Sequence, residues 1–411
     1  MQFNQILDHH ETKERLQQLV RQNRLSHSLL FLGKEGSGAL SMAIAFAQYI
    51  LCERVNPKAK SANVISLFGE EEIETIPINW EDSCGLCQSC LQAQQLIHPD
   101  LHFSYPALKR EAKHDKVLST DYISEWRSFI KESPYGNVTD WINFLKENPA
   151  TKIESPANKQ GNITSAECEA ILHQLSLKAF QSDYKIMIMW MPEFLQKEGN
   201  KLLKLIEEPP PDTIFLFVAE NENEILPTIL SRTQLVKIPR YSTENIEKAL
   251  IEKEVAPETA AQIAAISEGN FREAIQLLEN TEEDWQAHVR DWLNVILKND
   301  VNNQLKWIEE INRIGREKQK QFLKYFLHLI QQTIRVRYLN VEDLGGVSGN
   351  EIDFSNRINK MCTIEALEAI TQELDKATYY IERNAHAKML FHALTIRLYH
   401  IIKDNSLILV H

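Results

Sequence analysis

The chain has 411 residues, of which 43% are hydrophobic and 25% charged, a composition typical of soluble globular proteins with two or three domains. Its 45 lysines and arginines against 57 aspartates and glutamates give a net charge of −12, which excludes a general affinity for phosphate backbones. No apolar run approaches the roughly 20 residues that span a bilayer, and the N-terminus shows no secretory signal. The sequence therefore predicts a cytoplasmic protein with no membrane segment.

The first 240 residues alternate between helical and strand patterns. Apolar spacing predicts a helix over residues 11–24, and the short run at 29–32, closed by Gly33, predicts a buried strand that leads into a helix over 39–51. Later apolar runs predict further buried strands with helices between them. These later elements are strands over 185–190, 213–219 and 234–238, and helices that start at Thr164 and cover 194–208. Such alternation predicts a parallel α/β domain over residues 1–240.

A stretch without a steady hydrophobic period interrupts this pattern over residues 104–160 and contains several prolines. We interpret it as an insertion, with turns of helix only around Trp126 and Trp141. Directly after it, Thr164 and Glu167 match a capping box, in which each side chain accepts a hydrogen bond from the other residue's backbone amide. The sequence therefore predicts a capped helix N-terminus at this point.

Strand signals end at Tyr241. Two short helical patterns over 244–254 and 257–278 predict a small helical lid over residues 241–282. Longer amphipathic patterns then predict an all-helical collar or oligomerisation domain over residues 283–411. Two patterns carry this prediction: a core-facing stripe at Phe322, Tyr325, Phe326, Leu329 and Ile330, and a last helix over 385–402.

A glycine-rich turn between the first strand and its helix resembles a phosphate-binding P-loop, whose pattern is G-x-x-x-x-G-K-[ST]. Gly33 and Gly38 take the outer glycine positions, with Gly36 between them. However, Ala39 stands where the pattern has lysine and Leu40 where it has the magnesium-binding hydroxyl. The strand over residues 185–190 also lacks an acidic residue at its tip. The sequence therefore predicts a degenerate loop without catalytic function.

Three cysteines lie within seven residues, at Cys84, Cys87 and Cys90. In a reducing compartment such spacing favours a metal site over a disulfide. Zinc in a structural site takes four ligands, so this cluster supplies three of them. An iron–sulfur cluster is the competing metal site, although the expected further cysteine followed by proline is absent. Three reduced thiols without a ligand are the remaining alternative.

Several segments, in this order, resemble the AAA+ clamp-loader family of bacteria, and within it the delta-prime subunits of DNA polymerase III. They are NRLSHSLLF at 23–31, NKLLKLIEEPP at 200–210, PTILSRT at 227–233, GNFREA at 269–274 and IERNA at 381–385. The resemblance implies a non-hydrolysing subunit of a ring that also contains gamma/tau ATPase subunits and a delta subunit. Such a ring loads the sliding clamp onto primer–template DNA.

The same resemblance implies a four-cysteine zinc module over about residues 52–90, with the ligands Cys52, Cys84, Cys87 and Cys90. The 31 residues between Cys52 and Cys84 exceed the usual gap in the family. His98 and His102 therefore stay open as alternative fourth ligands.

Two arginines also gain a role from the resemblance. Arg232, in the segment that matches the family's S-R-C motif with Thr233 in place of cysteine, would act as an arginine finger on a neighbouring ATP site. Arg272 would correspond to a sensor arginine, which either contacts nucleotide or, beside a degenerate loop, makes a structural ion pair.

Two other functions remain possible from the sequence. One is an ATP-hydrolysing motor subunit of the gamma/tau type, against which the substitutions at Ala39 and Leu40 count. The other is a zinc-dependent DNA-binding module, against which the net charge of −12 counts.

Overall fold

The computed structural model describes residues 1–56, 80–110, 116–151, 153, 161–279, 285–298, 300–338, 349–383 and 385–404. The chain divides into two compact units, one formed by residues 1–245 with 269–272 and the other by residues 246–268 with 273–411. The lid segment predicted at 241–282 is thus shared between the two units, and its standing as a separate domain remains a prediction.

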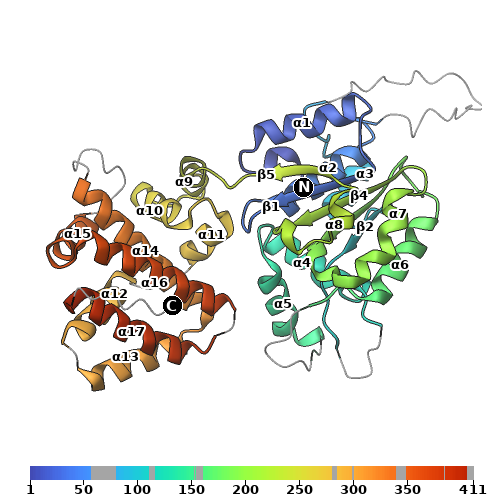
Figure 1. Cartoon of the computed structure of the whole chain (residues 1–411). Coiled ribbons are helices and arrows are strands. Elements are labelled where there is room, and N and C mark those ends of the chain that lie inside the picture. Colours follow the sequence, from blue (N-terminus) through green and yellow to red (C-terminus); the bar gives the residue numbers. More distant parts are fainter. Residues whose placement is uncertain are drawn as a thin grey trace, which may run out of the picture. The chain divides into compact units, whose positions relative to one another are not determined.

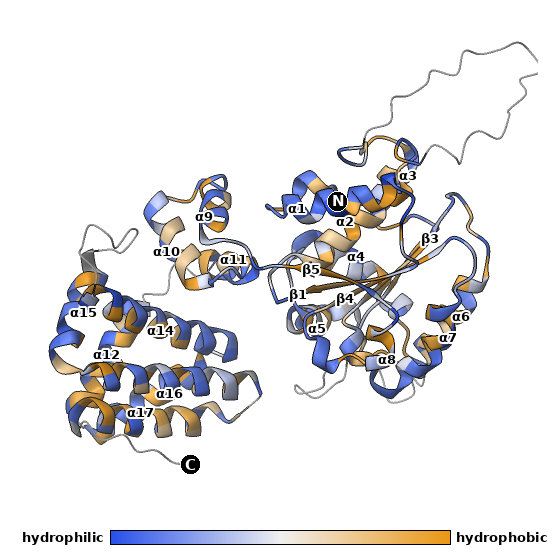
Figure 2. Ribbon diagram, turned by 45° about the horizontal axis from the view of Figure 1, so that its top comes forward, coloured by the Kyte–Doolittle hydropathy of each residue, from blue (hydrophilic) through white to orange (hydrophobic). Residues whose placement is uncertain are grey.

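The first unit is built on a parallel sheet of five strands in the order β2-β3-β4-β1-β5 (Figure 1). The strands are β1 (Ser28–Gly33), β2 (Leu101–Ser104), β3 (Lys185–Trp190), β4 (Thr213–Ala219) and β5 (Gln234–Ile238). All were predicted except β2, which has only four residues and includes two polar ones, so it shows no apolar run. The strands appear in Figure 2 as apolar ribbons between helices. A parallel α/β domain is therefore confirmed.

Helices cover this sheet and connect its strands. The α-helices of the first unit are α1 (His10–Arg21), α2 (Ala39–Leu51), α3 (Gln88–Gln94), α4 (Ile123–Glu132), α5 (Val138–Glu147), α6 (Ser165–Ser176), α7 (Leu203–Glu207) and α8 (Pro227–Leu230). The 3-10 helices are η1 (Phe3–Gln5), η3 (Ser119–Tyr122), η4 (Pro149–Thr151), η5 (Pro192–Leu202) and η6 (Glu222–Glu224). All thirteen residues of α2 are buried, so this helix forms the centre of the unit.

The stretch predicted as an insertion contributes to the main core. Trp126 of α4 and Trp141 of α5 are fully buried, with ring centroids 5.3 Å apart, and Tyr105 stacks on Trp126 at 4.0 Å. The predicted helical turns around both tryptophans are present. The buried residues of α4, Trp126, Phe129 and Ile130, follow the i, i+3, i+4 spacing of an amphipathic helix, a short period that the sequence analysis missed. Residues 111–115, 152 and 154–160 lie outside the described part of the chain.

Two local predictions need correction. The Thr164 hydroxyl caps α6 by accepting from the Glu167 amide at 3.2 Å, but Glu167 does not return the bond. Its buried carboxylate accepts from the Ser119 amide at 2.9 Å instead, because this tertiary partner is available to it. The helix predicted over 194–208 is the 3-10 helix η5 followed by the short α7, with a left-handed residue at Gln196 (φ 47°).

The second unit is helical throughout its described residues. Its helices are α9 (Thr243–Ile251, which begins in the first unit), α10 (Pro257–Ser267), α11 (Phe271–Glu279, which also begins there), α12 (Trp285–Lys298), α13 (Val301–Arg313), α14 (Arg316–Tyr338), α15 (Gly349–Met361), α16 (Ile364–Glu382) and α17 (Ala387–Asp404). The predicted stripe on α14 faces the core, where Trp292 and Trp307 stack at 4.7 Å. Among the described helices, none is long and apolar enough to cross a membrane.

Candidate functional site

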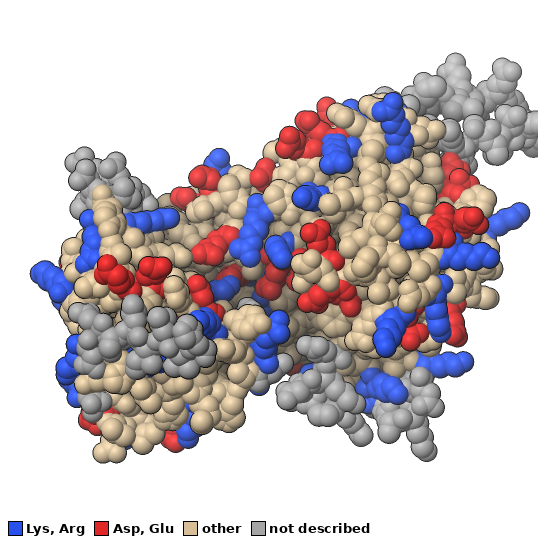
Figure 3. All heavy atoms as spheres, viewed as in Figure 1, with Lys and Arg blue, Asp and Glu red and all other residues tan. Residues whose placement is uncertain are grey.

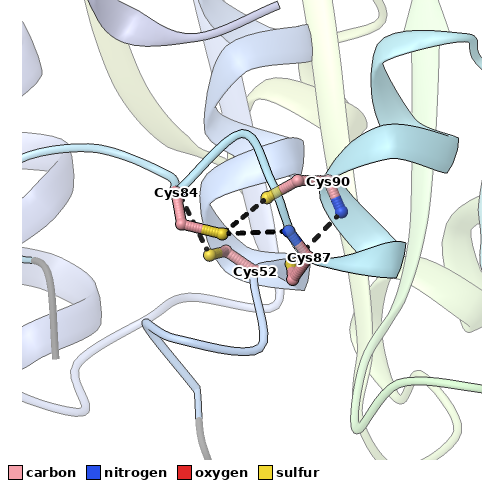
Figure 4. Close-up of side chains that lie close together, drawn as sticks. All are labelled: Cys52, Cys84, Cys87 and Cys90. Atoms are coloured by element: carbon pink, nitrogen blue, oxygen red, sulfur yellow. Dashed lines mark hydrogen bonds between the residues drawn. The ribbon is translucent and has the colours of Figure 1, made fainter. Parts of the chain in front are cut away.

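The four predicted cysteines meet beside the C-terminal end of α2. Cys52 follows α2, Cys84 and Cys87 lie on the loop before α3, and Cys90 lies within α3 (Figure 4). The four sulfur atoms all lie within 4.8 Å of one another. Cys84 Sγ and Cys90 Sγ are 3.8 Å apart, which equals the edge, about 3.8 Å, of a tetrahedron with zinc–sulfur bonds of about 2.3 Å. The donor set therefore fits a structural zinc ion.

The structure brings Cys52, rather than a histidine, to the other three cysteines. His98 Nδ1 accepts from the Asp100 amide at 3.1 Å, and His102 Nδ1 lies 2.7 Å from Gln174 Nε2. Burial lowers the pKa of His102 to about 4. Each imidazole is thus engaged elsewhere in the fold, and neither belongs to the described group of metal-ligating side chains.

Hydrogen bonds polarise the cysteine cluster. The Cys84 amide donates to Cys52 Sγ at 3.3 Å, and the Cys87 amide donates to Cys84 Sγ at 3.3 Å. Hydrogen bonds from Cys87 and Cys90 lower the pKa of Cys52 to about 3, and the bonds with Cys52 and Cys87 raise the pKa of Cys90. Four thiolates so close together would repel one another, and a divalent cation would offset that repulsion.

The N-terminal segment binds the edge of the cysteine module, a contact the sequence did not reveal. The backbone amides of Phe3 and Asn4 donate to the two carboxylate oxygens of Asp82 at 3.1 and 3.0 Å. Gln2 Nε2 donates to the Ser83 carbonyl at 2.5 Å. The module is therefore attached to the first residues of the chain as well as to α2.

The degenerate phosphate loop lies between β1 and α2, as predicted, and side chains of the same unit close over it. Gly36 and Gly38 have φ angles of +70° and +81°, which only glycine adopts without strain. A Cβ atom on Gly36 would lie 1.8 Å from Asn270 Oδ1, and one on Gly38 would lie 2.4 Å from Tyr241 Oη. The cavity beside the loop measures about 30 Å³. The loop is therefore closely covered by Asn270 and Tyr241.

Arg272 makes a buried ion pair at this loop. Its side chain is 5% exposed, and Nη1 donates to Glu35 Oε1 at 2.7 Å. Nε and Nη2 donate to the two carboxylate oxygens of Asp140. Two carboxylates thus surround the guanidinium, which is the structural arrangement that the sequence offered as one of two alternatives for Arg272.

Two carboxylates near the loop were given no functional role by the sequence analysis. Glu193, in the first turn of η5, is buried, and its Oε1 accepts from the amides of Glu220 and Asn221 at 2.7 and 3.0 Å. Glu220 directly follows β4 and lines the cavity. Burial, together with the charges of Glu35 and Glu193, raises the pKa of Glu220 to about 8. The position of Glu220 directly after a buried strand was the feature of the sequence from which its place beside the loop could have been predicted.

The raised pKa of Glu220 predicts a pH-dependent effect of Glu220→Gln. Between the unfolded pKa, near 4.5, and the folded value, about 8, the folded carboxyl keeps a proton that the unfolded one loses. The stability of the parent protein therefore falls as pH rises through this window, whereas glutamine mimics the neutral acid throughout. We expect thermal unfolding to show a stabilisation by Glu220→Gln that is small at pH 5 and largest above pH 8. The exposed Glu222→Gln variant should match the parent at both values.

Arg232 lies on the surface two residues after the end of α8. Its Nε donates to Glu207 Oε1, and its Nη1 donates to the Thr228 carbonyl at 2.8 Å and to Ser231 Oγ at 3.1 Å. The arginine side chain is 35% exposed and the glutamate 43%. Arg232 is therefore partly exposed, and its guanidinium forms hydrogen bonds with residues of its own chain.

A family model described as "DNA polymerase III, delta subunit" matches residues 8–242. The chain belongs to this family. Three of the segments that carried the resemblance, at 23–31, 200–210 and 227–233, fall inside the match. The segments at 269–274 and 381–385 fall outside it. The family assignment thus covers the sheet domain, the cysteine module, the degenerate loop and Arg232.

Curated relatives agree with membership of the DNA polymerase III delta subunit family. The chain is 25% identical over 264 residues to DNA polymerase III subunit delta' of Bacillus subtilis, which covers 64% of this chain and 57% of that protein. It is 25% identical over 190 residues to subunit gamma of Buchnera aphidicola, covering 40% of this chain and 53% of that protein. An 88-residue region is 36% identical to subunit gamma/tau of Mycobacterium tuberculosis, covering 18% of this chain and 15% of that protein. The chain thus spans little more than half the length of the first two.

Proposed function

We propose that this chain is a delta-prime-like subunit of the bacterial DNA polymerase III clamp loader that does not hydrolyse ATP itself. The closed phosphate loop carries the proposal. Ala39 and Leu40 replace the lysine and the hydroxyl that phosphoryl transfer requires, and Asn270 and Tyr241 lie against the loop glycines. Arg272, the nearby cation, is neutralised by carboxylates. Lys34, which also lines the cavity, sits too early in the loop to replace the missing lysine.

The proposed partners follow from the relatives. Because the chain is similar to delta' and gamma subunits, we propose that it assembles with gamma/tau ATPase subunits and a delta subunit. Such an assembly would act on a sliding clamp at primer–template DNA. Arg232 would contribute to an ATP site of a neighbouring subunit, since a guanidinium keeps its charge and binds phosphate oxygens with a planar fork.

The four cysteines are proposed to hold one structural zinc ion. Their sulfur geometry fits four-thiolate coordination. All four positions would be filled by protein, which leaves no open site for a reacting water. The metal would therefore join α2 to α3 and would play no part in catalysis.

The two alternative functions have weaker support. A gamma/tau-type motor would need a lysine and a hydroxyl in the phosphate loop, where this chain has Ala39 and Leu40. A zinc-dependent DNA-binding module would need a basic patch. On the face shown in Figure 3, basic and acidic side chains are interspersed, and the whole chain has a net charge of −12.

The purified chain should show no ATP turnover. Positioning and charge neutralisation supply nearly all phosphoryl-transfer catalysis, and the residues for both are missing. We expect isothermal titration with ATP and magnesium to give no binding heat and steady-state assays to give no rate. A gamma/tau subunit from the same organism serves as the positive control. Turnover that follows this protein through successive purification steps would contradict the proposal.

A further inference from the structure

The pair formed by Arg232 and Glu207 joins two segments that are separate in sequence, at the ends of two short helices. Leu205 and Ile206 anchor α7 in the core, and Ile229 anchors α8. The backbone at Arg232 is fixed as well, since its amide donates to the Ile229 carbonyl at 3.1 Å. Both side chains of the pair therefore extend from rigid backbone.

The hydrogen bonds engage only part of the guanidinium. Nε donates to Glu207, and Nη1 donates to the Thr228 carbonyl at 2.8 Å and to Ser231 Oγ at 3.1 Å. No residue in the described ranges accepts a hydrogen bond from Nη2. We propose that Glu207 is a positioning residue that holds Arg232 with Nη2 available to a phosphate oxygen of the neighbouring ATP site. This inference rests on the proposed trans-acting role of Arg232.

The physical reason lies in the flexibility of arginine. A free arginine side chain samples many rotamers, and fixing it only in the transition state would cost conformational entropy. An arginine that is oriented beforehand avoids this cost and meets the phosphate in a productive geometry. Both side chains of the pair are partly exposed to solvent, so it contributes little to folding stability. Its effect should therefore appear in catalysis rather than in stability.

The test is Glu207→Gln in a clamp loader reconstituted with all its subunits. Glutamine keeps the size of the side chain but loses the charge that holds the guanidinium. We expect about a tenfold loss of the part of the ATP hydrolysis rate that depends on Arg232, at the low end of the roughly 10–100-fold effect of residues that orient metal ligands. The loss should appear in kcat, with the KM for ATP little changed, because in this proposal Glu207 acts only through Arg232.

The adjacent Glu208→Gln provides the matched control, because Glu208 is also an exposed glutamate and makes no side-chain ion pair in the described structure. In an Arg232→Ala background, Glu207→Gln should have no further effect. Equal losses in both backgrounds, or a rate that rises with Glu207→Gln, would overturn the positioning role. If Glu207→Gln leaves the ATP hydrolysis rate unchanged while Arg232→Ala lowers it, the positioning role of Glu207 is overturned and the trans-acting role of Arg232 stands. If Arg232→Ala leaves the rate unchanged, both the trans-acting role of Arg232 and the positioning role of Glu207 are overturned.

Discussion

Arg232→Ala should slow ATP hydrolysis at the adjoining site of the reconstituted clamp loader by about 10³–10⁵-fold, the usual contribution of an arginine finger. The loss for the whole complex will be smaller, since only the site next to this subunit is affected. Clamp loading onto primed DNA should slow with it. Arg232→Lys should rescue poorly, because an ammonium group lacks the planar fork that meets phosphate oxygens.

Folding and assembly should survive this substitution. Both side chains of the Arg232–Glu207 ion pair are partly exposed to solvent, and ion pairs near the surface contribute at most about 1 kcal/mol. Arg240→Ala, at another exposed arginine of the same unit, controls for the loss of a surface charge. An Arg232→Ala complex that loads clamps at the parent rate would show that the arginine has no role in trans.

Cys52→Ser should lower the zinc content from about one ion per chain to nearly none. A serine hydroxyl does not replace a thiolate, and a closed zinc site needs all four ligands. Because structural zinc contributes about 10–16 kcal/mol in small isolated domains, its loss should unfold residues around α3. The second unit should stay folded, since its core contains none of these cysteines. Elemental analysis and proteolysis of the loop before α3 measure both effects.

Cys168→Ser is the matched control for this experiment. Cys168 is buried outside the cluster, and burial raises its pKa to about 11, so it remains a protonated thiol. Its substitution should leave the zinc content unchanged. Iron in place of zinc, or a full zinc content in Cys52→Ser, would contradict the four-cysteine site.

Local patterns in the sequence predicted much of the fold. The strands β1, β3 and β4 are continuous apolar runs because both faces of the sheet are covered by helices. The strand β2 escaped because it lies at the edge of the sheet, where four residues pair with β3 alone. The sequence analysis also did not predict that Trp126 and Trp141 belong to the main core, because burial of an aromatic ring depends on partners distant in sequence such as Tyr105.

The site shows the same division between local and long-range information. The spacing of Cys84, Cys87 and Cys90 indicated a metal site directly, whereas the fourth ligand depended on how the chain returns to α2. The missing lysine and hydroxyl of the phosphate loop were readable in the sequence. The covering of the loop by Asn270 and Tyr241 could not be predicted from the sequence, since these residues lie more than two hundred positions away from the loop glycines.

The most direct measurement of the central claim is clamp loading on primed DNA by gamma/tau and delta subunits of the same organism, with and without this chain. We predict that the three components form one complex on size exclusion and that loading requires all of them. ATP turnover should belong to gamma/tau alone, so a gamma/tau P-loop lysine variant should abolish it entirely. A complex that forms and loads clamps equally well without this chain, or ATP turnover that persists in that variant, would contradict the account.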